Sequence, residues 1–240
     1  MNTNPREVRM VYSNIITAFI FGYIFAIIYL MCNGIIALIT GNMTMLLTEF
    51  TTLRLDAIFL NFIRIISILS GILGVTISQI FIVHAIKNKK SIKRANTLVH
   101  ILQFFTAIGI VICVLFFYPA HSIALLSVTV SILICFITGC QVNNLENKIG
   151  DMTYQTMVFV GNIQQIANLL TEMLFNKFVS KTDYNYRDNT KKIGILIVIL
   201  FIYGLGLYVG AKVALEFKFY GLVILPFLLL VPLIITYNRR

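Results

Sequence analysis

The chain has 240 residues, of which 59% are hydrophobic and only 12% are charged, and its formal net charge is +10. Soluble domains carry about 25% charged residues, so this composition excludes an ordinary water-soluble fold and indicates a protein embedded in the lipid bilayer. The positive charge is confined to a few stretches between apolar runs, which argues against a nucleic-acid partner and is typical of a topology signal.

Six apolar stretches predict membrane-spanning helices, because roughly 20 apolar residues cross the hydrocarbon core. The first is too long for a cleavable signal peptide, so we expect it to be a permanent anchor. The predicted fold class is an all-α polytopic helix bundle that forms a single membrane domain over residues 1–240. In chain order, the expected spans lie near residues 11–38, 62–86, 98–118, 121–141, 193–213 and 219–237.

Lysine and arginine predict the orientation of the spans. With a cytoplasmic N-terminus, most cations lie on one side, and only Arg54, Arg64, Lys212 and Lys218 lie on the other. The positive-inside rule therefore predicts a multi-pass plasma-membrane protein with both termini in the cytoplasm. The basic loop after the second span is a possible contact for anionic lipid headgroups, although an ordinary topology determinant has the same composition. Its cations are Lys87, Lys89, Lys90, Lys93 and Arg94.

A segment that opens with Gly-Asn and closes with Leu-Leu-Thr-Glu occurs twice, over residues 41–49 and 161–172. Each copy follows one apolar span and precedes two more, which divides the chain into repeat one, about 10–118, and repeat two, about 120–238. Halves with an odd number of spans lie in opposite orientations, so the pattern predicts a 3+3 inverted repeat, a common plan for secondary transporters. The alternative is a chance repeat in a leucine-rich chain.

Each Gly-Asn segment predicts an interrupted or amphipathic helix, because glycine permits a break and asparagine is a good N-cap. A helix start at mid-membrane presents unpaired N–H groups and a positive dipole end to a polar or anionic solute. Two such starts that converge would form a central substrate site; the alternative is that they are ordinary caps at the membrane surface. The candidate substrate-binding residues are Asn33, Gly41, Asn42, Thr44, Gln141, Asn143, Gly161, Asn162 and Gln165.

Two glycine patterns predict close helix packing in the second and fifth spans, which are equivalent under the repeat. They are Gly71-x-x-Gly74 and Gly204-x-Gly206-x-x-x-Gly210.

The four cysteines and three histidines lack the spacing of a metal site or of catalytic partners, so we expect no metal, no cofactor and no enzymatic activity. The carboxylates Glu49, Asp56 and Glu172 have no partner spacing that supports an intramembrane enzyme. A small-solute transporter or exporter is the favoured function, and a scaffold or partner subunit without a transport path is the alternative.

Four places in the chain resemble the YoaK-like six-span bacterial membrane proteins, a domain-of-unknown-function family. They are Gly22-Tyr23, Thr40-Gly41-Asn42, Gly139-Cys140-Gln141 with Asn143, and the block from Thr153 to Gly161-Asn162. The resemblance implies the fold and a bacterial membrane location, and no established activity. The family often has an acidic residue shortly after the first pair and an arginine before the last block. Both are missing here, which argues against a charge-coupled mechanism.

Overall fold

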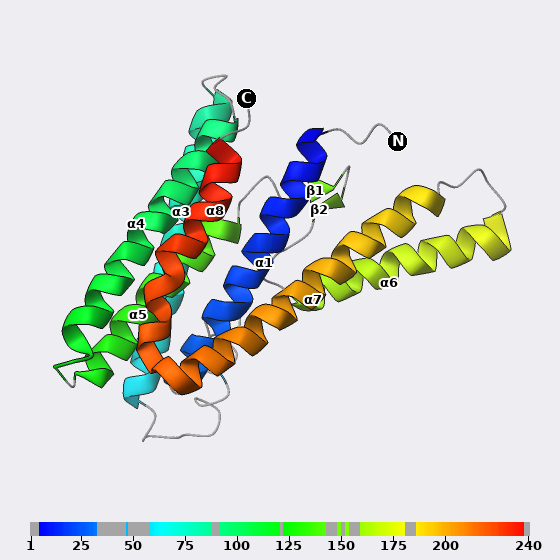
Figure 1. Ribbon diagram of the computed structural model, residues 1–240. Coiled ribbons are helices and arrows are strands. Elements are labelled where there is room, and N and C mark those ends of the chain that lie inside the picture. Colours follow the sequence, from blue (N-terminus) through cyan, green and yellow to red (C-terminus); the bar gives the residue numbers. More distant parts are fainter. Residues whose placement is uncertain are drawn as a thin grey trace.

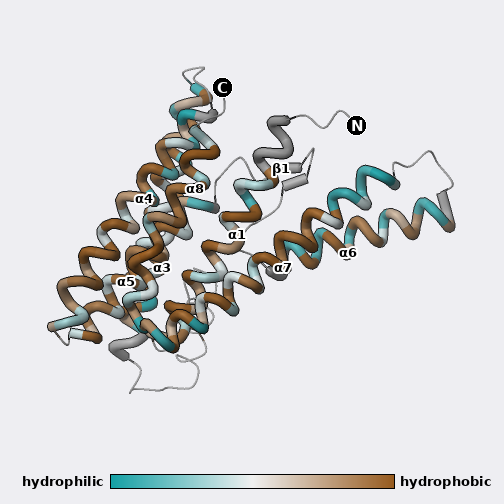
Figure 2. Tube along the Cα trace, viewed as in Figure 1, coloured by the Kyte–Doolittle hydropathy of each residue, from teal (hydrophilic) through white to brown (hydrophobic). Residues whose placement is uncertain are grey.

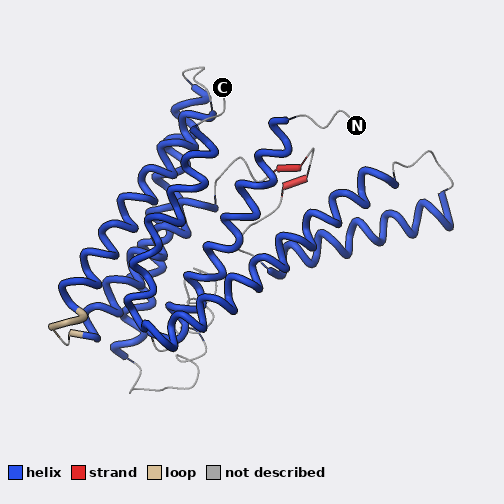
Figure 3. The backbone as a smooth tube through the Cα atoms, viewed as in Figure 1, coloured by secondary structure: helices blue, strands red, loops and turns tan. Residues whose placement is uncertain are grey.

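The computed structural model describes residues 5–32, 47, 58–87, 92–120, 122–142, 148–149, 152–153, 159–180 and 186–237. These residues are helical except for turns and one short antiparallel ladder between β1 (Lys148–Ile149) and β2 (Met152–Thr153) (Figures 1 and 3). The all-helical prediction is therefore confirmed. The helices are α1 (Pro5–Met31), α3 (Ile58–Lys87), α4 (Ile92–Phe117), α5 (Ile123–Val142), α6 (Phe159–Phe175) with the π-helical turn η2 (Asn176–Ser180), α7 (Tyr186–Phe217), the 3-10 helix η3 (Lys218–Ile224) and α8 (Leu225–Tyr237).

Five runs of the described chain are long and apolar enough to cross a membrane. Figure 2 shows that hydrophobic residues dominate the helices of the bundle, whereas hydrophilic residues gather at the outer ends of α6 and α7. The chain is thus a membrane-embedded helix bundle, as predicted. The five runs are Val11–Met31, Asn61–Lys87, Arg94–Phe117, Ile123–Gln141 and Tyr186–Tyr237.

The last of these runs contains two limbs, because α7 and α8 point in opposite directions with η3 between them (Figure 1). α8 has 13 residues, which is about 20 Å of α-helix. The seven residues of η3 add about 14 Å at the 3-10 rise. End to end, the two would therefore be about as long as the hydrocarbon core is thick, which is roughly 30 Å. The stretch 219–237, expected to be a sixth span, thus consists of most of η3 followed by the short helix α8.

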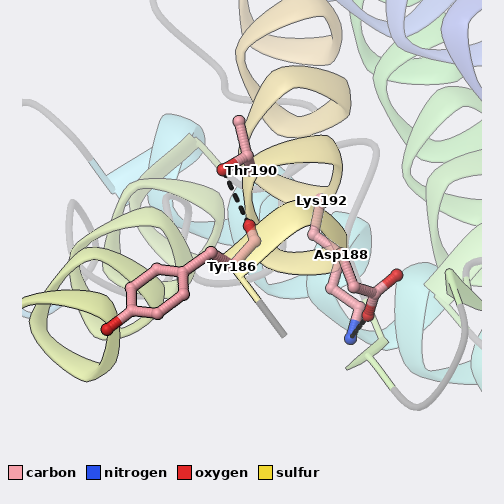
Figure 4. A network of polar contacts seen from close by, with 4 residues as sticks. All are labelled: Tyr186, Asp188, Thr190 and Lys192. Carbon is pink, nitrogen blue, oxygen red and sulfur yellow. Dashed lines mark hydrogen bonds and ion pairs between the residues drawn. The ribbon is translucent and has the colours of Figure 1, made fainter. Parts of the chain in front are cut away.

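Two predicted helix boundaries were wrong. The first span was expected to reach residue 38, but α1 ends at Met31 and Cys32 forms a turn; residues 33–38 lie outside the described residues. The fifth was expected to begin at 193, but α7 begins at Tyr186. Its first turns are polar: Lys192 Nζ lies 2.8 Å from Asp188 Oδ2, and Thr190 donates a hydrogen bond to the Tyr186 carbonyl (Figure 4). Such i, i+4 contacts support a helical start ahead of the predicted fifth span.

The reversal after α7 is fixed by backbone conformation at Lys218. Its φ of 52° is the left-handed value that terminates helices. Farther on, Pro226 lies in the first turn of α8, where a missing N–H costs nothing. Tyr23 on α1 holds η3 in place, because its hydroxyl donates a 2.6 Å hydrogen bond to the Gly221 carbonyl.

Helices α1 and α7 pack with their backbones in direct contact. A Cβ placed at Gly22 would overlap the Tyr203 carbonyl oxygen, and one at Gly206 would overlap that of Phe19. Farther along α7, Gly210 meets the Tyr23 carbonyl in the same way. The two helices run in the same direction (Figure 1). The glycine pattern in the fifth predicted span therefore marks a real helix crossing.

A second crossing of the same kind joins α3 to α5, which are also parallel to one another (Figure 1). A Cβ at Gly74 would overlap the Phe136 carbonyl oxygen, and one at Gly139 would overlap that of Gly71. Ser70 adds a hydrogen bond of 2.9 Å to the Ile132 carbonyl. The remaining long helices, α4 and α8, pack against each other; α4 also contacts α5 and α8 also contacts α1.

We expect Gly22→Ala and Gly206→Ala to destabilise the protein by roughly 1–3 kcal/mol, because the new methyl group overlaps a backbone atom that cannot move alone. Thermal unfolding of the purified protein in detergent measures the loss. The matched controls are Gly204→Ala and Gly109→Ala, where an added Cβ meets nothing within 4 Å. These controls should be neutral or stabilising by up to about 1 kcal/mol. Equal losses at all four positions would show that the crossings do not hold the bundle together.

Candidate functional site

The nine predicted site residues divide into two groups. Four of them, Gln141, Gly161, Asn162 and Gln165, belong to described helices. The other five, Asn33, Gly41, Asn42, Thr44 and Asn143, lie outside the described residues, so the first Gly-Asn segment and the expected meeting of the two segments have no structural description.

The second Gly-Asn segment lies at the beginning of α6. The helix begins at Phe159, so Gly161 and Asn162 lie within its first turn and do not form a break ahead of it. The Asn162 side chain is 2% exposed, whereas Asn168, two turns later on the same helix, is exposed. Asn162 is therefore directed into the protein.

α6 packs along α7 and runs antiparallel to it, beginning beside the middle of α7 (Figure 1). Ile166 and Leu169 pack against the hydrophobic core, while Gln164 and Glu172 are exposed. The helix is not among the apolar runs long enough to span. α6 is thus an amphipathic helix that begins beside the middle of α7.

Gln141 belongs to a hydrogen-bonded group that joins α4 to α5. Gln103 Nε2 donates to Gln141 Oε1 and to the Ile137 carbonyl, both at 3.1 Å. Gln103 Oε1 lies 3.0 Å from Nδ1 of His100. Since that oxygen is an acceptor, His100 donates through Nδ1 and keeps Nε2 as an acceptor when it is neutral. His100, Gln103 and Gln141 are each at most 2% exposed.

The sequence did not indicate Gln103, and it placed His100 at a span end. Both residues belong to α4, and their side chains are buried in the protein interior. The available signal was their spacing of three residues, which puts two hydrogen-bonding side chains on one face of an otherwise apolar helix. A polar face in a spanning helix is directed toward protein or water and not toward lipid.

Arg64 is a second buried polar position that the sequence treated only as a charge at a span boundary. Its side chain is 1% exposed, and Nη1 donates a hydrogen bond of 3.2 Å to Asn61 Oδ1. Ser67 follows one turn later and is fully buried. A buried guanidinium loses its hydration, which costs several kcal/mol before partners compensate.

The protein-facing stripe of α3 explains why these groups lie together. Asn61, Arg64 and Ser67 recur every third residue and continue into Gly71 and Gly74, so all five lie on the face that packs against α5. The opposite face has large exposed apolar side chains, such as Phe62, Leu69 and Leu73. The first three turns of α3 therefore present a polar face to the protein interior and an apolar face outward.

Two further predictions concern residues that the structure describes. Of the basic loop, Lys87 and Arg94 are exposed at the facing ends of α3 and α4. Within the described part of the chain, no three His, Cys, Asp or Glu side chains gather closely enough to hold a metal ion.

Gln103→Leu should destabilise the protein by roughly 1–3 kcal/mol, because it leaves His100 and Gln141 without their shared partner. The double variant Gln103→Leu/Gln141→Leu should cost less than the sum of the single changes, by roughly 0.6 to 2 kcal/mol. A double-mutant cycle on unfolding in detergent measures this coupling. Gln79→Leu, on the exposed face of α3, is the matched control and should show no loss. Strict additivity would contradict the hydrogen-bonded group.

Comparison with known proteins gives a family without an established activity. No curated protein and no solved structure matches the chain. The family model described as "Protein of unknown function (DUF1275)" matches residues 14–235, which include every long helix of the bundle. The chain belongs to this DUF1275 family.

Proposed function

We propose that the protein is a small-solute carrier or exporter, built from two inverted halves that enclose a polar interior. The first half comprises α1, α3 and α4; the second comprises α5, α7 and α8 together with η3. The proposal treats η3 and α8 together as a sixth membrane-spanning segment, in keeping with the six-span YoaK-like pattern. The observation that carries it is the correspondence between the two glycine crossings.

The crossings correspond residue by residue. In the first crossing, Gly22 lies against the carbonyl of Tyr203, three residues before Gly206. In return, Gly206 lies against the carbonyl of Phe19, three residues before Gly22. In the second, Gly139 and Gly74 make the same reciprocal contacts. Gly22 thus corresponds to Gly139 on the first helix of each half, and Gly206 corresponds to Gly74 on the second.

The directions of the helices support an inverted repeat. The α1–α7 pair runs one way and the α3–α5 pair runs the opposite way (Figure 1). The third helices, α4 and α8, contact each other, and the contact of α4 with α5 mirrors that of α8 with α1. These matching contacts support a real repeat over a chance similarity in a leucine-rich sequence. Inverted halves of this kind form the frame of many secondary transporters.

The orientation part of the proposal follows from charge. The start of α1 and the end of α8 lie at the same end of the bundle (Figure 1). α3 ends and α4 begins at this end as well (Figure 1), with exposed Lys87 and Arg94. The positive-inside rule then favours the cytoplasmic face of the plasma membrane for both termini, with the cations of the basic loop close to anionic headgroups.

A non-transporting scaffold is the second candidate, and the bonds among His100, Gln103 and Gln141 favour it. Side chains that satisfy one another across α4 and α5 stabilise a helix pair without any solute. Buried Asn162 in the first turn of α6 favours the carrier instead, since a polar helix start within the membrane is a recurring feature of transporter binding sites. Neither candidate involves enzymatic chemistry.

Flux through proteoliposomes tests the carrier. Purified protein is first screened by thermal shift against small anions, amino acids and aromatic acids, and uptake of each stabilising solute is then measured. Asn162→Leu should lower the initial rate about tenfold or more, the factor that 1.4 kcal/mol represents, because it removes a buried polar group at the start of α6. Asn168→Leu, exposed on the same helix, is the matched control and should transport normally. Folded protein that neither binds nor moves any solute of the panel would favour the scaffold.

A further inference from the structure

The two glycine crossings allow α3 and α7 to be compared position by position. Because Gly74 corresponds to Gly206 and Gly71 to Tyr203, the residues before them correspond as well. Arg64 is then the counterpart of Leu196, and Ser67 is the counterpart of Ile199. Arg64 is 1% exposed and Leu196 is 0% exposed; Ser67 is 0% exposed and Ile199 is 1% exposed. Equivalent places in the packing are therefore polar in α3 and apolar in α7.

Packing alone does not account for the polar side chains of α3. The α7 stripe shows that this frame accepts leucine and isoleucine at the same depth of burial. A buried charge is harder to accommodate than a hydrocarbon of similar size, and replacement by apolar residues is often neutral or stabilising. The packing of the glycine crossing therefore does not by itself require an arginine at this position.

Two parallel helices begin at the end of the bundle in which Arg64 lies. Arg64 lies in the second turn of α3, and the parallel helix α5 begins at the same end of the bundle (Figure 1). Both helices thus bring their positive dipole ends to this region. Neither helix has an acidic residue in its first turn.

The side chains around Arg64 supply further hydrogen-bonding groups. Asn61 Oδ1 accepts from Arg64 Nη1, which leaves the Asn61 amide N–H groups as donors. Ser67 Oγ is fully buried and has no hydrogen-bond partner among the described residues. A guanidinium has five donors in a planar fork, a geometry that matches carboxylate and phosphate oxygens.

We propose that Arg64, assisted by Asn61 and Ser67, binds a small oxyanion, either a carboxylate or an inorganic phosphate-like ion, at the end of the bundle away from the two termini. The identification of this anion as the transported solute rests on the proposed carrier function. The site itself does not, because it follows from the asymmetry between α3 and α7.

Anion binding by the purified full-length protein in detergent tests the proposal. The probes are acetate, succinate, benzoate, phosphate and sulfate, each compared with chloride at equal ionic strength, by thermal unfolding and calorimetric titration. We expect at least one oxyanion to raise the unfolding temperature of the parent protein. Arg64→Leu, which reproduces Leu196, should fold and lose this response, and Ser67→Ile, which reproduces Ile199, should weaken it. Arg64→Lys keeps the charge without the fork and should bind about tenfold more weakly or worse.

The control is Arg94→Leu, which removes an exposed arginine at the start of α4 and should leave the response intact. The site is disproved if no oxyanion stabilises the parent, or if the response survives in Arg64→Leu. It is also disproved if Arg64→Leu is unstable and Glu49→Gln or Asp56→Asn restores its stability, since Arg64 would then only neutralise a carboxylate of the chain. If Arg64→Leu does not fold and neither carboxylate substitution restores its stability, the test is the Arg64→Lys variant. Undiminished oxyanion binding by Arg64→Lys would contradict the proposal that the planar guanidinium binds the anion.

The two proposals fail in different ways. Oxyanion binding that depends on Arg64, without uptake into proteoliposomes, would remove the carrier and leave the anion site. Uptake of a solute at equal rates by the parent and Arg64→Leu would leave the carrier and remove the anion site from its path.

Discussion

Contact between backbones at two helix crossings is the constraint on which the rest of the bundle depends. Lipid offers no hydrophobic force to press helices together, so association relies on close van der Waals approach and on hydrogen bonds. Glycine at positions 22, 74, 139 and 206 removes the Cβ atoms that would hold the axes apart. The two crossings define the pairs α1–α7 and α3–α5, and α4, α6 and α8 pack around those pairs.

The crossings also determine which polar groups are buried. On α3 and α7, positions spaced three to four residues apart share the face of the glycines and continue toward the start of the helix. Side chains at these positions are buried against the neighbouring helix, whether they are polar or apolar. On α7 the stripe remains apolar through Leu196 and Ile199; on α3 it becomes polar at Ser67 and Arg64. The same geometry thus buries a hydrocarbon surface in one half and a charged one in the other.

The sequence predicted the spans, the crossing on α7 and the amphipathic character of α6, because apolar length and glycine spacing are local properties. It could not show that Gly204 faces open space while Gly206 lies against a carbonyl, since spacing does not give the rotation of a helix about its axis. Gln103 was missed because its partner Gln141 is 38 residues away. Arg64 was misinterpreted because a hydropathy pattern treats every charge near a span end as a boundary.

Each crossing joins one helix from each proposed half, and this limits the motions that a carrier of this architecture can make. If the halves were the moving bodies, every transition would separate Gly22 from Tyr203 and Gly74 from Phe136, where the helix backbones lie too close to admit a Cβ atom. A relative movement of the α1–α7 pair against the α3–α5 pair keeps both crossings intact. Arg64 belongs to the α3–α5 pair. Gln103 on α4 donates hydrogen bonds to Gln141 and to the Ile137 carbonyl of that pair. Asn162, in contrast, lies on α6, which packs against α7 of the other pair. The polar groups are thus divided between the two helix pairs, which is the arrangement that the proposed carrier would need for alternating exposure of a shared site.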